Sequence, residues 1–438
     1  MSEPTCLVAD TICRTVELGV TITGAAIADE LTWIDCRPVE HDPTCPKCGE
    51  PGRLRDHVER VLTDLPVVGH PTRLRVRVPR FTCGTDDCTV AIFRQCMTRV
   101  AAPKAATTVR CARWILQRLA IDKMSVSAIA KTLGLNWETV NTMAAELTRE
   151  LVFNTAGHLE GVRYLGVDEH KWKHCRGQGE ADLVTVLVDL TPVIDGTGAA
   201  RLLDMVAGRS AAVLKTWLAD RDANFRSRVK VVAMDGFAGY RTATAEALPA
   251  AQAVMDPFHV VHRAADKLTA CRQRIQQDTC GHRGRTGDPL YGIRRIILTR
   301  NELLTAKQKA KLDKALAAHD AHAAVEVTAG PYYQDLIGAY ANPDRRAGKL
   351  AMFKCLKRIR SGLPKGLEEL AQLGRSLWKR RREVLAYFDV GISNGPVEAI
   401  NGRLEHLRGI ALGFRNLNHY ILRSLIHSGQ LQDRINAL

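Results

Sequence analysis

Three acidic residues stand where two apolar runs end and where a helix is expected to begin. Asp168 and Asp235 each close a short apolar run that is typical of a strand. Glu398 follows Pro396, whose fixed φ suits the first turn of a helix. Acids at the carboxyl ends of strands lie where open α/β sheets place their chemistry. Three carboxylates on one face could hold two Mg²⁺ or Mn²⁺ ions, which prefer oxygen ligands and favour phosphodiester chemistry.

Other acids compete for these positions. Glu169 follows Asp168 directly and is expected to point away along the strand, because neighbouring strand residues face opposite sides. Asp256 ends a further apolar run and is the main rival of the second acid. Glu405 lies seven residues after Glu398 and therefore on the same helical face. The residues alone leave these choices open.

Two close cysteine pairs near the N-terminus predict a metal site of a different kind. Cys45-Pro-Lys-Cys48-Gly and Cys83-Gly-Thr-Asp-Asp-Cys88 could bring four thiolates around one Zn²⁺ in a closed, structural site. The chain has 13 cysteines, an odd number, and no secretion signal, so metal binding is favoured over a disulfide framework. Cys96 is an alternative to Cys88, and four unrelated buried thiols remain the simplest competing interpretation.

Residues 126–143 have the spacing of a helix-turn-helix. Gly134 suits the turn, and the apolar residues on either side of it supply inward faces for two helices: Ile129, Ala130, Leu133, Val140 and Met143. A plain αα-hairpin would show a similar pattern. In a DNA-binding unit, the outward residues of the second helix would reach a major groove: Trp137, Glu138, Thr139, Asn141 and Thr142.

A basic helical zone precedes the third acid. Between residues 344 and 383 there are 13 Lys and Arg residues against four acids. The positions expected to contact DNA phosphates are Lys354, Lys357, Arg358, Arg360, Lys379, Arg380, Arg381 and Arg382. Trp378 could stack on an unpaired base, although a core position is the better interpretation.

The elements that must position these groups divide the chain into five parts, which predict a multidomain α/β protein. Residues 1–100 hold the cysteine pairs and short strands such as 73–78, and residues 104–155 hold the helix-turn-helix. Strand-like runs alternate with helices over 160–262, and 182–189 is expected to form a hairpin with the first run. Helices fill 263–390 after a loop at 281–289, and 391–438 ends the chain with the helix of Glu398.

Bulk composition agrees with a DNA-binding globular protein. The chain has 438 residues, of which 46% are apolar and 25% charged, so two to four domains are expected. The net charge of +15 favours a polyanionic partner. The chain lacks an apolar stretch of membrane-spanning length and a signal peptide, so a soluble, cytoplasmic, nucleoid-associated protein is expected.

At these residues the chain resembles the DDE transposases of bacterial insertion sequences, and most of all the ISL-three family. The matching pieces occur in the right order along nearly the whole chain: Cys45-x-x-Cys48-Gly, Gly166-Val-Asp168-Glu-His170, Met234-Asp235-Gly-Phe-Ala-Gly-Tyr240, Asp256-Pro-Phe-His259-Val, Ser393-Asn-Gly-Pro-Val-Glu398-Ala-Ile-Asn401 and Gly413-Phe-Arg-Asn416-Leu-Asn-His-Tyr420. The family pairs a zinc ribbon and a helix-turn-helix with an RNase H-like core.

The resemblance implies a role for each matched residue. It makes Asp168, Asp235 and Glu398 the catalytic, magnesium-binding acids, and it places Asp256 and His259 in a supporting Asp-x-x-His element. Asn401 becomes the companion of the third acid. The 163 residues between Asp235 and Glu398 are too many for one crossover and are similar to an all-helical insertion into the core. Glu405 departs from the family, in which a basic residue is common. It could disfavour DNA there or pair with Arg403 or Arg408.

The implied function is recognition of terminal inverted repeats in double-stranded DNA, followed by metal-dependent strand cleavage and strand transfer. Two ends must be held together, so a dimer or a larger assembly on DNA is expected. Two other hypotheses are a non-catalytic DNA-binding regulator derived from a transposase and a recombinase with a covalent Ser or Tyr intermediate. The regulator would leave nearly two thirds of the chain unexplained, and no Ser or Tyr has a recognisable surrounding motif.

Overall fold

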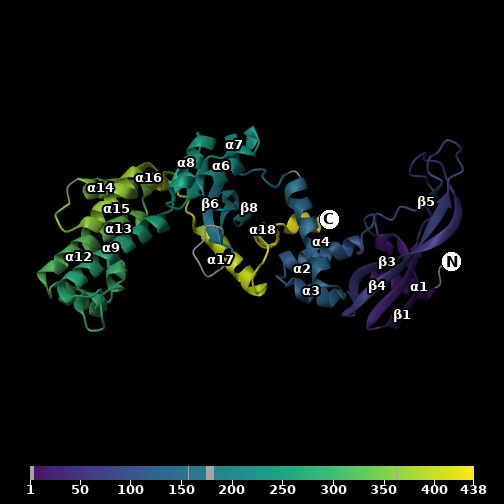
Figure 1. Ribbon diagram of the computed structural model, residues 1–438, viewed down its shortest axis with the longest axis horizontal. Helices are drawn as coiled ribbons and strands as arrows, with labels where there is room; N and C mark the ends of the chain where they lie inside the picture. The colour runs from purple at the N-terminus through teal and green to yellow at the C-terminus, as the bar shows by residue number, and fades with distance from the viewer. Residues whose placement is uncertain (1–3, 156, 174–181, 362) are drawn as a thin grey trace. The chain divides into compact units, whose positions relative to one another are not determined.

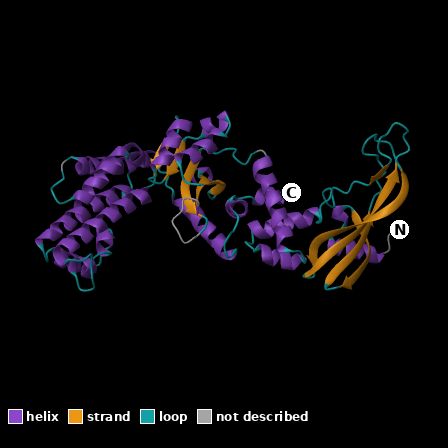
Figure 2. Ribbon diagram, in the orientation of Figure 1, coloured by secondary structure: helices purple, strands orange, loops and turns teal. Residues whose placement is uncertain are grey.

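The computed structural model describes residues 4–155, 157–173, 182–361 and 363–438. The chain forms two compact units (Figures 1 and 2). The first unit comprises Met1–His158 and Leu404–Leu438, and the second comprises Leu159–Arg403. We expected all of 391–438 to complete the catalytic core. The structure instead groups the residues from Leu404 onward with the N-terminal unit.

The first unit begins with α1 (Pro4–Cys13) and a five-stranded sheet in the order β1-β2-β4-β3, with β5 paired to β4. The strands are β1 (Val20–Ala28), β2 (Leu31–Pro38), β3 (Arg53–Val67), β4 (His70–Thr82) and β5 (Ile92–Arg94). The predicted strand at 73–78 lies within β4. Its alternating Leu74, Val76 and Val78 are buried, while the arginines between them face the other side.

Helices complete the first unit: α2 (Val109–Ala120), α3 (Val126–Leu133), α4 (Trp137–Arg149), α18 (Leu417–Ser428) and α19 (Gln432–Asn436). Ser125 caps α3 and Asn136 caps α4, each through its side chain. Gly134 ends α3 with φ of 59°, a conformation that glycine adopts without strain. The C-terminal α18 packs on α2 and α4, and α19 packs on α2.

The second unit contains a mixed five-stranded sheet in the order β10-β9-β6-β7-β8. The strands are β6 (Tyr164–Lys171), β7 (Leu183–Asp189), β8 (Arg201–Ala207), β9 (Val231–Met234) and β10 (Gln252–Met255). β7 pairs antiparallel with both β6 and β8. On the other side of β6, β9 is parallel to β6 and β10 is parallel to β9. The predicted hairpin between the first run and residues 182–189 is confirmed.

Alternation along β6 separates the two faces of this sheet. Leu165 and Val167 enter a buried cluster with the helices α6 (Ala211–Ala219), α7 (Ala223–Arg228) and α8 (Ala238–Ala247). Gly166 faces the other side, where α17 (Gly395–Ile410) packs. A Cβ at Gly166 would stand 2.4 Å from a methyl of Val397, so glycine permits this close approach of helix and strand.

A helical region lies between β10 and α17 and has its own apolar core. Its longer helices are α9 (Pro257–Cys280), α11 (Ala306–Leu316), α13 (Asp335–Ala341), α14 (Arg345–Arg360), α15 (Glu368–Lys379) and α16 (Arg381–Val390), with short α10 (Pro289–Gly292) and α12 (Ala323–Val327). The loop predicted after α9 is present, because α9 ends at Gly281 and α10 begins at Pro289. In the described part of the chain, no helix has the length and apolarity needed to cross a membrane.

Candidate functional site

The three predicted acids meet at the carboxyl ends of β6 and β9. β9 ends where Met234 pairs with Val167, so Asp235 follows at the level of Asp168 on the neighbouring strand. Glu398 comes from the first turn of α17, on the sheet face that Gly166 leaves open. Residues separated by 163 positions in the sequence are thereby brought to one edge of the sheet.

Asp168 is shared by two groups of ligand atoms. Oxygen or nitrogen atoms of Asp168, His259 and Glu398 lie within 4.8 Å of one another, and so do carboxylate oxygens of Asp168, Glu169 and Asp235. Asp168 is 4% exposed and Asp235 is 5% exposed, whereas Glu398 lies on the surface. The site is therefore a buried acidic floor with one exposed carboxylate at its rim.

Crowding of these acids makes the ionised form of Asp168 unfavourable in the protein alone. Burial, and then the nearby Glu398, Glu169 and Asp235, raise the pKa of Asp168 to about 8. A divalent cation between the carboxylates would reverse this balance, because it replaces like-charge repulsion with attraction. The donor set is mainly carboxylate oxygen, which fits Mg²⁺ or Mn²⁺ better than a sulfur-preferring metal.

Glu169 corrects one sequence expectation. Its backbone position does face away from Asp168, but the longer side chain reaches the end of β9, and its carboxylate joins Asp168 and Asp235. Burial and Asp235 raise the pKa of Glu169 to about 7, against the opposing effect of Arg209. Strand alternation alone does not predict this contact. β6 continues to Lys171, but β9 ends at Met234, so Asp235 lies in the loop that follows and meets Glu169 there.

Arg209 is a charged partner that the sequence analysis missed. Its guanidinium lies 3.1 Å from Glu169 and 3.6 Å from Asp235, measured between nitrogen and oxygen atoms. The same group stacks over the ring of Phe237 at 4.5 Å, which fixes its direction. It precedes α6 in a segment without a recognisable motif, so nothing in the sequence pointed to it.

Asn401 holds Asp168 in place. One turn after Glu398 on α17, its side-chain Nδ2 donates to Asp168 Oδ2 at 3.1 Å and approaches the Glu169 carbonyl at 3.5 Å. The other oxygen, Oδ1, accepts the backbone N–H of Glu169 at 2.9 Å, so the two contacts together fix the orientation of the Asp168 carboxylate. The structure thus brings the expected companion residue to the first acid.

Asp256 and His259 lie at the start of α9. Asp256 is 1% exposed, accepts the backbone N–H of Asn394 at 2.6 Å and lies 3.3 Å from His259 Nδ1. The Asp256 contact raises the pKa of His259. Asp256 therefore ties β10 and α9 to the turn before α17, and the acid that joins the cluster is Asp235.

Among the described residues, Glu405 belongs to neither of the two groups of ligand atoms that contain Asp168. Its carboxylate pairs with Arg408 one turn later on α17. Of the alternatives raised by this departure from the family, the structure therefore shows the ion pair with Arg408 rather than with Arg403.

The four predicted cysteines converge in the first unit. Cys45 Sγ lies 3.8 Å from Cys88 Sγ, and Cys48 Sγ lies 3.6 Å from Cys83 Sγ. Thiolates placed tetrahedrally about 2.3 Å from zinc would be separated by roughly 3.8 Å, so the spacing fits one Zn²⁺. Cys96 is exposed and lies outside this group of four ligands. The alternative of unrelated thiols is not what the structure shows.

The second helix of the predicted helix-turn-helix is α4, and its outward residues are not equivalent. Trp137, Glu138 and Thr142 are exposed and Thr139 is half-buried. Asn141, expected to reach DNA, is instead 4% exposed, and its Nδ2 lies 3.4 Å from His419 Nδ1 of α18. No local pattern in residues 126–143 indicates that a C-terminal helix covers this side of α4.

The basic helical zone also needs one correction. Lys354, Lys357, Arg358, Arg360, Lys379 and Arg382 are exposed and Arg381 is half-buried. Arg380, expected among the DNA contacts, is 8% exposed and donates to the Gly236 carbonyl at 3.1 Å. It therefore links the start of α16 to the loop that carries Asp235.

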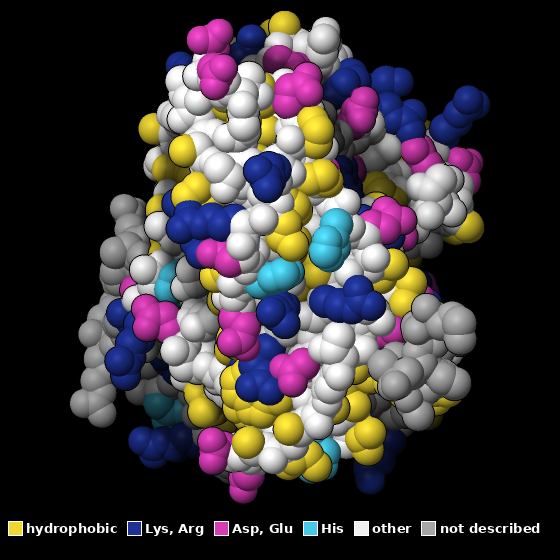
Figure 3. Space-filling view, turned by 90° about the vertical axis from the view of Figure 1, so that its right-hand side faces the viewer, with side chains coloured by type: hydrophobic (Ala, Val, Ile, Leu, Met, Phe, Trp, Pro, Cys, Tyr) yellow, Lys and Arg dark blue, Asp and Glu magenta, His cyan; other side chains and the backbone are white. Residues whose placement is uncertain are grey.

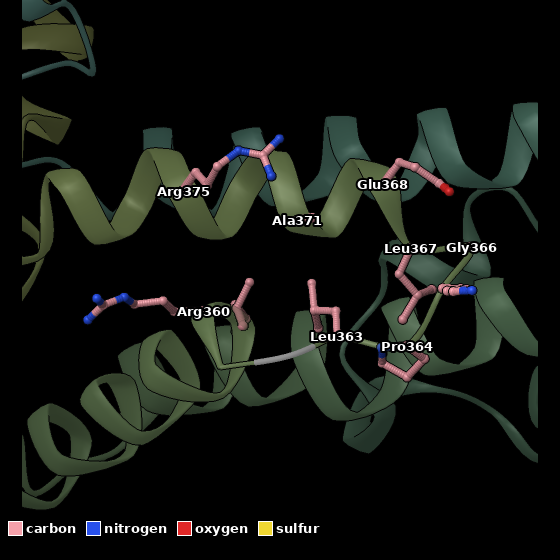
Figure 4. A pocket seen from close by; sticks show the side chains of 10 residues that line it. Arg360, Leu363, Pro364, Gly366, Leu367, Glu368, Ala371 and Arg375 are labelled. Atoms are coloured by element: carbon pink, nitrogen blue, oxygen red, sulfur yellow. The ribbon is translucent and has the colours of Figure 1, made fainter.

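The aromatic of this zone has a structural position. Trp378 packs against the helical core between the guanidinium groups of Arg360 and Arg381, whose carbon atoms lie 4.5 and 5.0 Å from its ring. Arg360 and Arg375 also line a hollow of about 330 Å³ between α14 and α15 (Figure 4). On the face drawn in Figure 3, basic and acidic side chains are interspersed.

Comparisons with known proteins agree with this geometry. Residues 165–424 match the ISL3 DDE model described as "Transposase", and residues 41–88 match the "zinc-finger of transposase IS204/IS1001/IS1096/IS1165". The first match covers more than half of the chain and contains all three acids of the cluster. The chain therefore belongs to the ISL-three family of DDE transposases.

Curated relatives carry the same description. The transposase for insertion sequence element IS1001 of Bordetella parapertussis is 22% identical over 88% of this chain and 89% of its own length. The transposase for IS1557 of Mycobacterium tuberculosis is 24% identical over 67% of this chain and 66% of its own length. Among solved structures, the "Drosophila P element transposase strand transfer complex" matches 72% of this chain and 90% of its own at 12% identity and a TM-score of 0.36, which does not establish a shared fold.

Proposed function

We propose that this protein binds the terminal inverted repeats of an insertion sequence and catalyses DNA strand cleavage and strand transfer. The observation that carries the proposal is the meeting of Asp168, Asp235 and Glu398 at one sheet edge in a chain of a DDE transposase family. Asp168, Asp235 and Glu398 would hold Mg²⁺ or Mn²⁺, with Asp256, His259 and Asn401 in supporting positions.

The second unit fits an RNase H-like core with a helical insertion. Three antiparallel strands followed by two parallel ones, in the order β10-β9-β6-β7-β8, support this assignment. The insertion would be the helical region between β10 and α17, which has its own apolar core. Through Arg380 and Asp256 it contacts the loops that carry or precede the acids.

The reaction proposed is phosphodiester hydrolysis followed by transesterification. A water oxygen joins the phosphorus at the element end, the P–O3′ bond breaks, and the 3′-oxygen leaves as a hydroxyl. That hydroxyl then attacks a phosphorus of target DNA and displaces another 3′-oxygen. Divalent cations, when bound, supply activation of the attacking oxygen and stabilisation of the departing one.

The chain's own groups prepare this site. Asn401 orients one oxygen of Asp168, and Arg209 offsets part of the negative charge of Glu169 and Asp235. The raised pKa of His259 favours an imidazolium beside Asp256. Its positive charge then lies at the rim, where a phosphate would approach.

DNA recognition is assigned to the first unit and the basic helices. The zinc ribbon of Cys45, Cys48, Cys83 and Cys88 and the helix pair α3–α4 would recognise the terminal repeats, with Trp137, Glu138, Thr139 and Thr142 toward the major groove. Exposed cations of α14, α15 and α16 would contact phosphates near the acids. A dimer or larger assembly would hold both ends.

Cleavage of a labelled end tests the assignment. Purified protein and DNA flanking its gene are incubated with and without Mg²⁺, and nicking and end binding are measured separately. Asp168→Ala, Asp235→Ala and Glu398→Ala should abolish nicking yet keep binding. The exposed Asp220→Asn should leave both nicking and binding unchanged. Normal cutting by Asp235→Ala would contradict the assignment. Binding without cutting by the wild type would support a DNA-binding regulator instead.

A further inference from the structure

A hollow in the first unit, here called the loop pocket, lies between the helix pair α3–α4 and the segment leading into α18. Its volume is about 850 Å³, within the range of sites that enclose small molecules. Its lining comes from two parts of the chain: Ser125, Val126, Ser127, Trp137 and Asn141 from the helix pair, and residues 410–416, His419 and Arg423 from the C-terminal segment.

A buried cation faces this pocket. Arg423 is 7% exposed, and its Nη1 has no hydrogen-bond partner among the described residues. Burial lowers the pKa of its guanidinium to about 10, so the group still carries its charge at neutral pH. A buried charge without a counter-ion is costly, and an anionic group entering the pocket would remove that cost.

Three helices begin at the loop pocket. Residues of the first turns of α3, α4 and α18 line it, namely Ser127, Trp137 and His419, and each helix has a side-chain N-cap. The N-terminal turns of three helices thus lie at the same hollow as Arg423. This combination favours an anion, and phosphate is the anion that DNA provides.

Aromatic rings supply the other walls. Trp137 is 49% exposed, and Phe414 is held by an edge contact with the buried Tyr420, with ring centroids 4.9 Å apart. Flat, apolar ring faces of this kind stack on nucleobases. Asn141 and His419 also line the pocket, and they contact each other, with Asn141 Nδ2 3.4 Å from His419 Nδ1.

We propose that the loop pocket binds one unpaired nucleotide of a DNA strand, with the phosphate toward Arg423 and the base against Trp137 and Phe414. A base inside a duplex is already stacked on both faces, so only an unpaired nucleotide offers its base to these walls. The inference rests on the proposed function because it takes DNA as the substrate. It adds a site for single-stranded DNA that is separate from the acidic cluster in the chain.

The test compares two duplexes made from DNA flanking the gene, one blunt and one with a three-nucleotide single-stranded extension. Full-length, zinc-loaded protein is titrated without Mg²⁺, and affinity is followed by fluorescence anisotropy, with 2-aminopurine in the extension to report stacking. The wild type should bind the extended duplex about tenfold more tightly, as stacking of about 1–3 kcal/mol per base implies. An extension of abasic nucleotides should lose this preference.

Variants locate the effect in the pocket. Arg423→Gln and Phe414→Leu should lose most of the preference and the 2-aminopurine quenching while binding blunt duplex like the wild type. Arg423→Lys should keep part of it, and Arg149→Gln, which removes one exposed charge from the same unit, should keep all of it. Equal affinity for both duplexes, or a preference unchanged in Arg423→Gln and Phe414→Leu, would overturn this inference alone. Absence of binding to either duplex would overturn the proposed function as well.

Discussion

At the scale of single residues, the candidate site depends on how each charged group is compensated. The carboxylates of Asp168 and Glu169 are crowded, and both have raised pKa values. Arg209 and Asn401 offset this crowding in different ways, one by charge and one by a hydrogen bond. The ionisation of these acids therefore depends on the groups that surround them as well as on their burial.

Arg380 and Arg382 show this difference between neighbours. Arg380→Met should lower the free energy of unfolding by about 1–3 kcal/mol, because it leaves the buried Gly236 carbonyl without its donor and removes one of the two ion-pair partners of Glu383. Arg382→Met removes an exposed charge, so it should leave stability unchanged and weaken DNA binding. Urea unfolding and salt-dependent binding measure the two effects. The assignment of Arg380 is wrong if its replacement only weakens binding.

Asn401 acts on the reaction through Asp168. Asn401→Ala should lower the nicking rate about 10–100-fold, the usual effect of removing a group that orients a metal ligand, and should raise the Mg²⁺ concentration needed. The metal dependence of single-turnover nicking checks this. Gly402→Ala, a change at a neighbouring helix position with open space around it, provides the control. An unchanged metal requirement with a lower melting temperature would indicate a purely structural residue.

At the scale of elements, much of both sites could be predicted because local patterns mark them. The apolar runs that end in Asp168 and Asp235 became β6 and β9, and the Pro396 signal marked the start of α17. The cysteine knuckles marked the zinc site. Glu169, Arg209 and the burial of Arg380 and Asn141 could not be predicted, because they depend on contacts between segments far apart in the sequence.

The zinc site of Cys45, Cys48, Cys83 and Cys88 lies at one end of the antiparallel pair β3–β4, called the cysteine hairpin. It should stabilise this hairpin only when all four cysteines are present. Cys48→Ser should release the zinc and lower the melting temperature of the first unit, because structural zinc contributes directly to folding. Cys96→Ser should retain one zinc per chain, since Cys96 lies apart from the four ligands. A colorimetric zinc assay on reductively purified protein distinguishes them. Loss of zinc from Cys96→Ser would show that the fourth ligand is misassigned.

β8 carries a buried acid that should make stability depend on pH. Burial raises the pKa of Asp204, which accepts hydrogen bonds from Trp217 and from the Met205 backbone. An acid whose folded pKa is raised destabilises the folded state as pH rises from the unfolded pKa of 3.8 through the folded one. Asp204→Asn removes this cost but keeps only one of the two accepted hydrogen bonds, because its amide nitrogen cannot accept from Trp217 or from the Met205 backbone.

Asp204→Asn should therefore be less stable than the wild type near pH 4, where it lacks one hydrogen bond, and should gain stability relative to the wild type toward pH 7. The gain should be about 1.4 kcal/mol for each unit by which the pKa is raised. Urea unfolding of both proteins at each pH isolates this residue, because all other titrations are shared. A difference that moves in favour of the wild type as pH rises would show that the carboxylate is stabilised in the folded protein.

At the scale of the whole molecule, the first compact unit is built from two segments that are far apart in the sequence. The second unit is inserted between two segments of the first, and α17 contributes Glu398 to one unit and Leu404 onward to the other. From the sequence, all of 391–438 is expected with the catalytic core, whereas the structure divides this segment at Leu404. The apolar face of α18 predicts that the helix is covered, but it does not specify which helices cover it.

Removing the C-terminal helices should consequently damage a distant part of the sequence. A chain that stops after Gly413 lacks the buried Tyr420, Leu422, Leu425 and Ile426 of α18, which pack on α2 and α4. Each buried apolar side chain contributes about 1.5–3 kcal/mol, so α2 to α4 should become open to proteolysis and end binding should be lost. Zinc content and the melting of the second unit should stay as in the full chain, because the cysteine hairpin and the second sheet have separate cores. Limited proteolysis with mass spectrometry measures this. If α2 to α4 stay protected in the shortened chain, these helices fold without α18, and the first unit does not depend on both ends of the chain.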